Sequence, residues 1–259
     1  MKKEKIAFIT GASDGVGKAI ALNFAKKGFS IYLLSRSKQK LVKLKKNIFK
    51  KYSNNRVEII PYNMEKKFSE NILKFCKKKL GLPNILINNS GGPEPANFIA
   101  TSDKMWEKTI NRNLLSVIKL STIFSKSMVK NKWGRMLTIS STVAKEPSSR
   151  MVQSATARAA VLAFNKSISF DLARSNVTNN SILLGGIETN RLKKLIKINA
   201  KKSKINEEQF RKNILKNIPA GRFGEPEEIA FLVEFLVSDN GRYINGQSIV
   251  IDGAMSKII

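Results

Sequence analysis

Apolar residues along the chain fall into short continuous runs, separated by longer stretches in which they recur every three or four positions. The short runs predict strands at 5–10, 30–35, 57–62, 84–89, 134–141, 177–184 and 246–253. The longer stretches predict helices at about 16–27, 38–51, 68–79, 103–130 and 152–174. Apolar strands that alternate with helices are typical of a parallel sheet covered on both faces. The pattern therefore predicts one α/β domain over 1–259, with a doubly wound parallel sheet of about seven strands.

Length and the rare residue types narrow the class of protein. A chain of 259 residues with 42% hydrophobic residues can bury a large core. Its apolar runs stay well short of the roughly 20 residues that span a bilayer, and "MKKEKIAFIT" is too briefly apolar for a signal peptide. The single Cys76 forms no internal disulfide, so we expect a cytoplasmic location. The absence of histidine excludes histidine-based acid–base catalysis and ordinary zinc sites, and we expect no metal.

The large positive charge does not by itself change the expected class of protein. The formal net charge is +28, which suits nucleic-acid or anionic-membrane binding. The lysines, however, are spread over nearly every predicted helix rather than gathered in one arm. This distribution indicates a compositional bias. We therefore expect non-specific polyanion binding at low salt, and neither a specific nucleic-acid partner nor a membrane.

The turn after the first predicted strand carries three glycines in "TGASDGVGKAIA", at Gly11, Gly15 and Gly17. Glycine permits a tight turn and lets a pyrophosphate approach the backbone closely. A helix that begins near Val16 points its free N–H groups and its dipole at such phosphates. The strand–turn–helix context therefore predicts a Rossmann-type dinucleotide site.

The end of the second predicted strand indicates which dinucleotide is bound. In NAD-binding folds, a carboxylate about 20 residues after the glycines holds the ribose 2′-hydroxyl. Here Arg36 stands 19 residues after Gly17, flanked by Ser35 and Ser37. A guanidinium and hydroxyl groups suit a 2′-phosphate. We therefore expect NADP(H) to be preferred over NAD(H).

Several further segments resemble the short-chain dehydrogenase/reductase family, in the family's order. They are "TGASDGVG", "NNSGG" at 88–92, "NRNLLS" at 111–116, "TISS" at 138–141, "GGIETN" at 185–190, "IPAGRFGEPEEIA" and "YINGQSIVIDGA". The C-terminal third is close to that of the 3-oxoacyl-[acyl-carrier-protein] reductases. The resemblance covers essentially the whole chain and implies a nicotinamide-dependent oxidoreductase.

The resemblance also implies roles for individual residues. It places the active-site Asn of the family at Asn113 and its catalytic Ser at Ser141. It implies a larger set of cofactor contacts, at Gly11, Ser13, Asp14, Gly15, Val16, Gly17, Arg36, Asn63, Met64, Asn89, Ser90, Gly91, Arg158, Ile187 and Thr189. Leu184 stands where the family usually has Pro.

The proton-donating pair of the family is altered in this chain. A Tyr-x-x-x-Lys pair begins thirteen residues after the catalytic Ser in the family, and those two positions hold Ser154 and Arg158 here. The tyrosines are Tyr32, Tyr52, Tyr62 and Tyr243, so no shift of register restores the pair. A serine and an arginine one helical turn apart are also typical of an exposed face, but their position in the chain predicts that they line the nicotinamide site. A serine hydroxyl is shorter and far less acidic than a phenol, and arginine does not exchange its proton.

Two functions therefore remain open. The first is an NADP(H)-dependent oxidoreductase on a small carbonyl, alcohol or 3-oxoacyl-type substrate, with Asn113, Ser141, Ser154 and Arg158 as the catalytic set. Its proton would come from water, from a substrate group or from Lys145. The second is a nicotinamide-nucleotide-binding protein without dehydrogenase turnover, acting as a sensor or an oligomer partner.

The resemblance implies partners as well. It predicts a homodimer or homotetramer, paired through the 152–174 helix and the 243–259 segment. Residues 190–219 fall where relatives carry a substrate lid, and they hold ten cations and two carboxylates. A basic lid suits an anionic substrate, such as an acyl group on coenzyme A or on an acidic carrier protein. The alternative is a solvated segment of a protein that is basic throughout.

Overall fold

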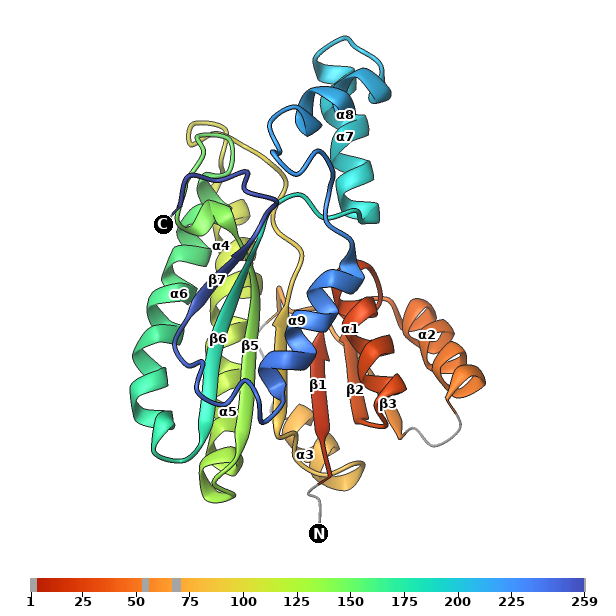
Figure 1. Ribbon diagram of the computed structural model, residues 1–259, viewed down its shortest axis with the longest axis vertical. Helices are drawn as coiled ribbons and strands as arrows, with labels where there is room; N and C mark the ends of the chain where they lie inside the picture. Colours follow the sequence, from red (N-terminus) through yellow and green to blue (C-terminus); the bar gives the residue numbers. More distant parts are fainter. Residues whose placement is uncertain (1–3, 53–55, 67–70, 259) are drawn as a thin grey trace.

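Seven parallel strands form one sheet in the computed structural model, which describes residues 4–52, 56–66 and 71–258 (Figure 1). The strands are β1 (Ile6–Thr10), β2 (Ser30–Ser35), β3 (Val57–Pro61), β4 (Ile85–Asn89), β5 (Gly134–Ser141), β6 (Val177–Leu184) and β7 (Ser248–Ile251). Their order across the sheet is β3-β2-β1-β4-β5-β6-β7. The order reverses between β1 and β4, and in doubly wound folds ligands bind at this reversal, beyond the carboxyl ends of the strands. The predicted fold class is confirmed.

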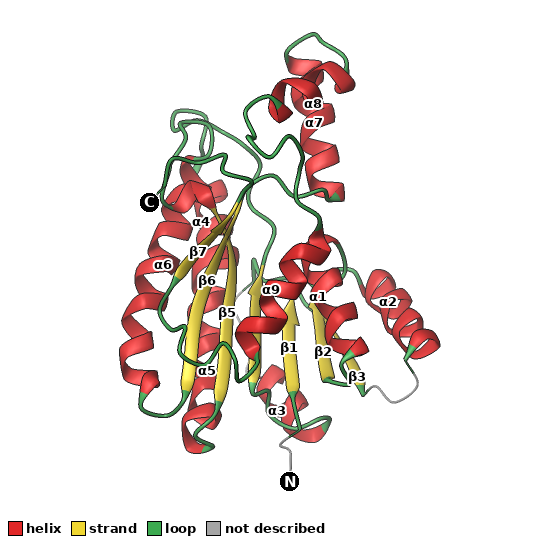
Figure 2. Ribbon diagram, in the orientation of Figure 1, coloured by secondary structure: helices red, strands yellow, loops and turns green. Residues whose placement is uncertain are grey.

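Helices cover both faces of the sheet (Figure 2). One face carries α1 (Gly15–Lys26), α2 (Lys38–Lys51) and α9 (Pro226–Val237); the other carries α3 (Asn71–Lys78), α4 (Asp103–Ile110), α5 (Ser116–Lys130) and α6 (Val152–Ala173). Two helices, α7 (Asn190–Lys202) and α8 (Glu207–Leu215), stand beyond the carboxyl ends of the strands (Figure 1). Within the described residues, no helix combines the length and apolarity needed to cross a membrane.

Side chains that alternate along the strands build two cores. Ile9 and Leu33 lie on the face packed against α1, α2 and α9. Phe8 and Tyr32 lie on the opposite face with Phe124 of α5, and the rings of Phe8 and Phe124 are 5.0 Å apart. Each such side chain contributes about 1.5–3 kcal/mol through burial. Because both faces are buried, the strands read as continuous apolar runs in the sequence.

One predicted helix is interrupted in the structure. The sequence predicts a single helix over 103–130, but a π-helical turn at Asn111–Leu115 separates α4 from α5. The hydroxyl of Ser116 donates to the carbonyl of Arg112 inside this turn, at 2.7 Å. The wider turn sets Asn113 into the interior, where it is buried. Periodicity does not reveal the extra residue, since the apolar spacing on either side is unchanged.

Other predicted boundaries shift by a few residues. The last strand is shorter than the predicted 246–253, because Gly246 and Gly253 adopt positive φ angles and end the extended backbone. The predicted 68–79 helix begins among residues outside the described part of the chain and is observed as α3 from Asn71.

Tyr32 is held in the core by hydrogen bonds to the backbone. Its hydroxyl donates to the carbonyl of Cys76 at 2.9 Å and accepts from the N–H of Leu80 at 2.7 Å. Burial raises the pKa of the Tyr32 phenol above its ordinary value. Burial also raises the pKa of the Cys76 thiol, to about 12. Both groups are therefore neutral parts of the core at physiological pH.

We expect Tyr32→Phe to lower the free energy of unfolding by about 1–3 kcal/mol, because the buried Leu80 N–H loses its acceptor. Urea denaturation followed by circular dichroism measures this change. Tyr243→Phe is the matched control, since that side chain is 98% exposed, and it should change stability by no more than about 0.5 kcal/mol. Equal stability of both variants and the parent would contradict the role of the Tyr32 hydroxyl as acceptor for the Leu80 N–H.

Candidate functional site

The glycine turn between β1 and α1 has the shape expected of a phosphate-binding loop. Gly11 and Gly15 have φ angles of +58° and +50°, which favour glycine. A Cβ on Gly17 would lie 2.4 Å from the Gly11 carbonyl oxygen, so the backbone crosses itself closely there. The helix α1 begins at Gly15, and the first-turn N–H groups, including that of Val16, point out of the helix end. The turn therefore presents a cradle that fits a pyrophosphate.

Asn89 holds this turn in place. Its backbone N–H donates to the hydroxyl of Thr10 at 2.8 Å, and its side-chain amide donates to the carbonyls of Thr10 and Gly11, both at 3.2 Å. These bonds link the end of β4 to the end of β1 across the point where the strand order reverses. Asn89 thus fixes the backbone of the glycine turn.

The segment after β6 also reaches the turn. The Thr189 methyl group lies 3.1 Å from where a Cβ on Gly15 would stand. The Thr189 hydroxyl caps α7, accepting from the Leu192 N–H at 3.2 Å. Ile187 is buried just before it. The structure therefore brings Thr189 against the glycine turn, which holds Ser13 between Gly11 and Gly15, whereas Ile187 forms a bridge with Gly224.

At the end of β2, Arg36 points largely into solvent. Its side chain is 71% exposed, and its Nη1 lies 3.8 Å from a carboxylate oxygen of Glu65. The neighbouring Ser37 hydroxyl caps α2, whereas the Ser35 hydroxyl is buried without a protein partner. An exposed guanidinium beside an unsatisfied hydroxyl fits the phosphate of a ribose.

Two further residues predicted as cofactor contacts, Asn63 and Met64, follow β3. The Asn63 side-chain oxygen accepts from the backbone N–H of Glu65 at 3.1 Å, which shapes the loop. Met64 is buried and packs into the core formed with α3 and α5. Both lie one strand beyond Arg36 in the sheet.

Asp14 carries a negative charge into the glycine turn, and the structure shows how this charge is compensated. Lys40 of α2 approaches it to 3.2 Å, and the Asn190 amide donates to both of its oxygens. Burial alone would raise its pKa, but hydrogen bonds from Asn190, Gly15 and Lys40 hold the pKa of Asp14 below its ordinary value. The sequence interpretation missed Lys40, since nothing distinguishes it from its neighbouring lysines.

At the end of β4, the π-helical turn places Asn113 beside Ser90. The Asn113 amide donates to the Ser90 hydroxyl at 2.8 Å and to the Gly91 carbonyl at 3.3 Å. On its other side, Arg112 donates to the Asn113 oxygen at 3.3 Å and pairs with Glu65 at 2.9 Å. Burial lowers the pKa of Arg112, and Glu65 partly offsets this effect. The predicted residues Asn113, Ser90 and Gly91 therefore form one hydrogen-bonded group.

Ser154 and Arg158 are buried, with exposed fractions of 2% and 8%. The Arg158 Nε donates to the Ser154 hydroxyl at 3.2 Å, Nη1 to the Ile139 carbonyl at 3.2 Å, and Nη2 to the Ser90 carbonyl at 3.4 Å. Ser141 lies two residues beyond Ile139 at the end of β5. The alternative of an exposed, solvated pair is wrong, because α6 turns this face onto the ends of β4 and β5.

Burial is also the main cause that lowers the pKa of Arg158, to about 10, with further contributions from Arg191 and Arg112. The guanidinium is therefore still protonated at neutral pH. It places a permanent positive charge beside Ser154.

Arg191 is a second residue that the sequence interpretation missed. It was counted only as one cation of a basic lid, but its Nη2 donates to the Pro93 carbonyl at 2.9 Å and lies near Gly92. The signal in the sequence was its place, two residues after Thr189, at the start of α7.

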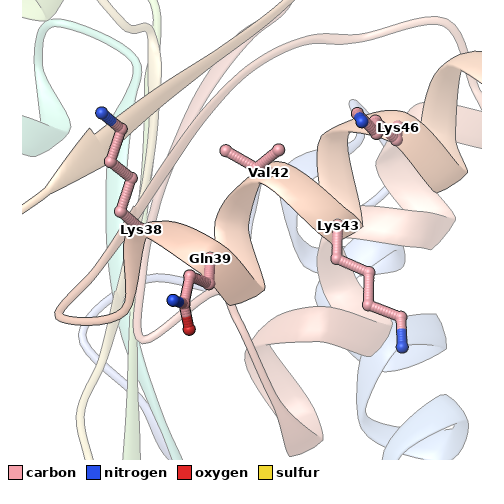
Figure 3. A pocket seen from close by; sticks show the side chains of 5 residues that line it. All are labelled: Lys38, Gln39, Val42, Lys43 and Lys46. Atoms are coloured by element: carbon pink, nitrogen blue, oxygen red, sulfur yellow. The ribbon is translucent and has the colours of Figure 1, made fainter.

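A surface depression elsewhere takes no part in this site. Figure 3 shows it along α2, lined by Lys38, Gln39, Val42, Lys43 and Lys46. All five belong to one helix, on the side away from its buried residues Leu41, Leu44 and Ile48.

Several known proteins resemble this chain in sequence and in structure. The family model for short chain dehydrogenases matches residues 5–200. The NADPH-dependent reductase BacG of Bacillus subtilis is 32% identical over 257 residues, covering 99% of both chains. The 3-oxoacyl-[acyl-carrier-protein] reductase FabG of Buchnera aphidicola subsp. Schizaphis graminum is 32% identical over 253 residues, covering 98% of both. The crystal structure of YwfH, an NADPH-dependent reductase involved in bacilysin biosynthesis, superposes with a TM-score of 0.94 and 31% identity, covering 99% of this chain and 100% of that one.

We expect Gly17→Ala to weaken NADPH binding about tenfold or more, because the added Cβ would stand 2.4 Å from the Gly11 oxygen and displace the turn. Fluorescence titration with NADPH measures the affinity. Lys18→Ala is the control, since this exposed neighbour on α1 leaves the turn intact. NADPH affinity within twofold of the parent for Gly17→Ala would show that the turn is not the phosphate cradle.

Proposed function

The chain belongs to the short-chain dehydrogenase family, and we propose that it is an NADPH-dependent oxidoreductase that reduces a small carbonyl compound or oxidises the corresponding alcohol. One observation carries this proposal. The group formed by Asn113, Ser90, Arg158 and Ser154 lies at the ends of β4 and β5, next to the glycine turn at the end of β1. A dinucleotide laid from β2 across β1 would end at this group.

The proposed cofactor sites fit NADPH along its whole length. Ser35 and Arg36 would hold the 2′-phosphate, the first turn of α1 the pyrophosphate, and Arg158 the ribose next to the nicotinamide. BacG and YwfH are both NADPH-dependent reductases, in agreement with the cofactor predicted from Arg36. When bound, the reduced nicotinamide supplies a hydride to a carbonyl carbon.

We assign the handling of the carbonyl oxygen to Ser141, Ser154 and Arg158. The Ser154 oxygen accepts from Arg158, which leaves its own O–H free to donate to a carbonyl oxygen. The Arg158 charge stabilises the negative charge that develops there as the hydride arrives. The proton that completes the alcohol comes from water, because a serine hydroxyl is too weak an acid to give one up and Lys145 is exposed.

A specific observation supports the second candidate function, that of a nucleotide-binding protein without turnover. None of the tyrosines lies at the ends of β4 or β5: Tyr32 is in the core, Tyr62 follows the edge strand β3, and Tyr52 and Tyr243 precede β3 and β7. The site therefore lacks a phenol among the described residues. This absence favours a sensor only if hydride transfer is undetectable.

The lid and the assembly state are further parts of the proposal. We propose that 190–219 is a substrate lid, supported by a separate small core of Ile196, Ile218 and Phe223. Phe210 and Ile214 of α8 pack against this core, which includes Ile196 of α7. A homodimer or homotetramer through α6 is supported by Phe170, which is 69% exposed on that helix. Since FabG is a 3-oxoacyl-[acyl-carrier-protein] reductase, carrier-protein thioesters are one substrate class to test, besides coenzyme A thioesters and small ketones.

We expect the protein to oxidise NADPH in stopped-flow mixing with a panel of ketones, oxo acids and 3-oxoacyl thioesters. Ser154→Ala should lower kcat about 10²-fold, because one hydrogen-bond donor to the developing oxyanion is lost, while NADPH affinity stays within twofold. Lys145→Ala serves as the control and should leave kcat unchanged. No oxidation of bound NADPH by any compound of the panel would favour the nucleotide-binding alternative.

The cofactor preference is expected to depend on Arg36. The parent protein should bind NADPH more tightly than NADH, and Arg36→Asp should reverse this order by replacing the attraction of the 2′-phosphate with repulsion. Isothermal titration with both nucleotides at fixed ionic strength measures the ratio. Lys38→Asp makes the same charge change two residues away and should preserve the preference. Equal affinity of the parent for both nucleotides would contradict the assignment of Arg36.

A further inference from the structure

Two guanidinium groups converge on the backbone at Gly91–Pro93, at the far end of the proposed cofactor site. A Cβ built on Gly92 would lie 3.2 Å from Arg191 Nη2, 3.8 Å from Arg158 Nη2 and 3.7 Å from the Ser154 hydroxyl. The three groups come from α7 and α6, two elements far apart in the sequence. The three groups therefore lie together around Gly92, a residue that has no side chain.

Neither guanidinium forms an ion pair there with any described residue, and of the two residues only Arg158 is buried whereas Arg191 is exposed. Within the described part of the chain, no ion pair within 4 Å involves Arg158 or Arg191, whereas the nearby Arg112 is paired with Glu65 at 2.9 Å. Arg158 is more than nine-tenths buried, and it donates only to neutral oxygens, those of Ser154, Ile139 and Ser90. A buried charge without a counter-charge is costly to the fold.

Positive charges act on one another at this cluster. Burial lowers the pKa of Arg191, the charge of Arg112 lowers it further, and the carboxylate of Glu94 partly offsets this; Arg191 in turn lowers the pKa of Arg158. An anion bound to Arg191 beside Arg158 would stabilise both positive charges. The planar guanidinium fork matches the two oxygens of a carboxylate.

Small residues surround the two arginines. Gly91 and Gly92 bring backbone without side chains to the cluster, and the nearest atoms to a Cβ on either one include Arg191 nitrogens. Ser154 is also much smaller than the tyrosine that the family has at this position. The smallest side chains of the site therefore lie next to its two positive charges.

We propose that Arg191 binds the carboxylate of the substrate beside the positive charge of Arg158, which makes a small oxo acid the substrate class. This inference rests on the proposed function, since it places the carboxylate next to the carbonyl that receives the hydride. A 3-oxoacyl thioester is neutral near its reacting carbonyl and would leave both guanidinium groups unpaired. Arg191 is thus a specificity-determining residue carried by the lid.

The test uses the complex of the full chain with NADPH, and oxamate as the probe. Oxamide has the same shape but no charge, so it is the matched ligand control. At fixed ionic strength, calorimetric titration should show oxamate binding at least tenfold more tightly than oxamide. Arg191→Met should remove this difference, and Arg191→Lys should retain part of it, because an ammonium keeps the charge without the fork.

Lys201→Met is the matched protein control, since it removes an exposed cation from the same helix without touching the cluster. It should leave the affinity for oxamate within twofold of the parent. Equal affinities of the parent for oxamate and oxamide, in a protein that binds NADPH, would overturn the carboxylate site alone. Failure to bind NADPH would overturn the proposed function, and the carboxylate site with it. An equal loss of oxamate affinity in Lys201→Met and Arg191→Met would show that the effect depends on net charge alone, and would overturn the site.

Discussion

The hydrogen bonds of one buried guanidinium, that of Arg158, hold the candidate site together. They join α6 to the backbone of β5 at Ile139 and to the end of β4 at Ser90. Burial of this charge opposes folding, and the two large apolar cores on either side of the sheet must outweigh that cost. A buried charge that lowers stability is retained when it is needed for binding or chemistry. We interpret Arg158 in this way.

Most of the fold was predictable from the sequence because both faces of the sheet are covered. Strands buried on two sides appear as uninterrupted apolar runs, and all seven predicted runs contain an observed strand. The π-helical turn at Asn111–Leu115 was not predictable, since an inserted residue leaves the apolar spacing of both flanking helices intact. The end of β7 was missed because the backbone angles of two glycines, rather than hydropathy, set it.

The candidate site was predictable where a motif coincides with a strand end. Gly11, Gly17, Asn113 and Ser154 all lie where the topology gathers the carboxyl ends of β1, β4 and β5. Lys40 and Arg191 were not singled out, because their importance depends on contacts across 26 and 98 positions of the chain, with Asp14 and Pro93. In a chain with 47 basic residues, only the fold distinguishes such cations from their neighbours.

The hydrogen bonds between Asn190 and Asp14 connect two parts of the molecule that perform different tasks. Asn190 is the first residue of α7, and Asp14 caps α1, the helix whose end we assign to the phosphates. A movement of α7 that breaks these bonds would remove a compensating partner from a carboxylate at the proposed cofactor cradle. The position of α7 and the affinity for a dinucleotide bound there would then be thermodynamically coupled, and this coupling would act equally in both directions.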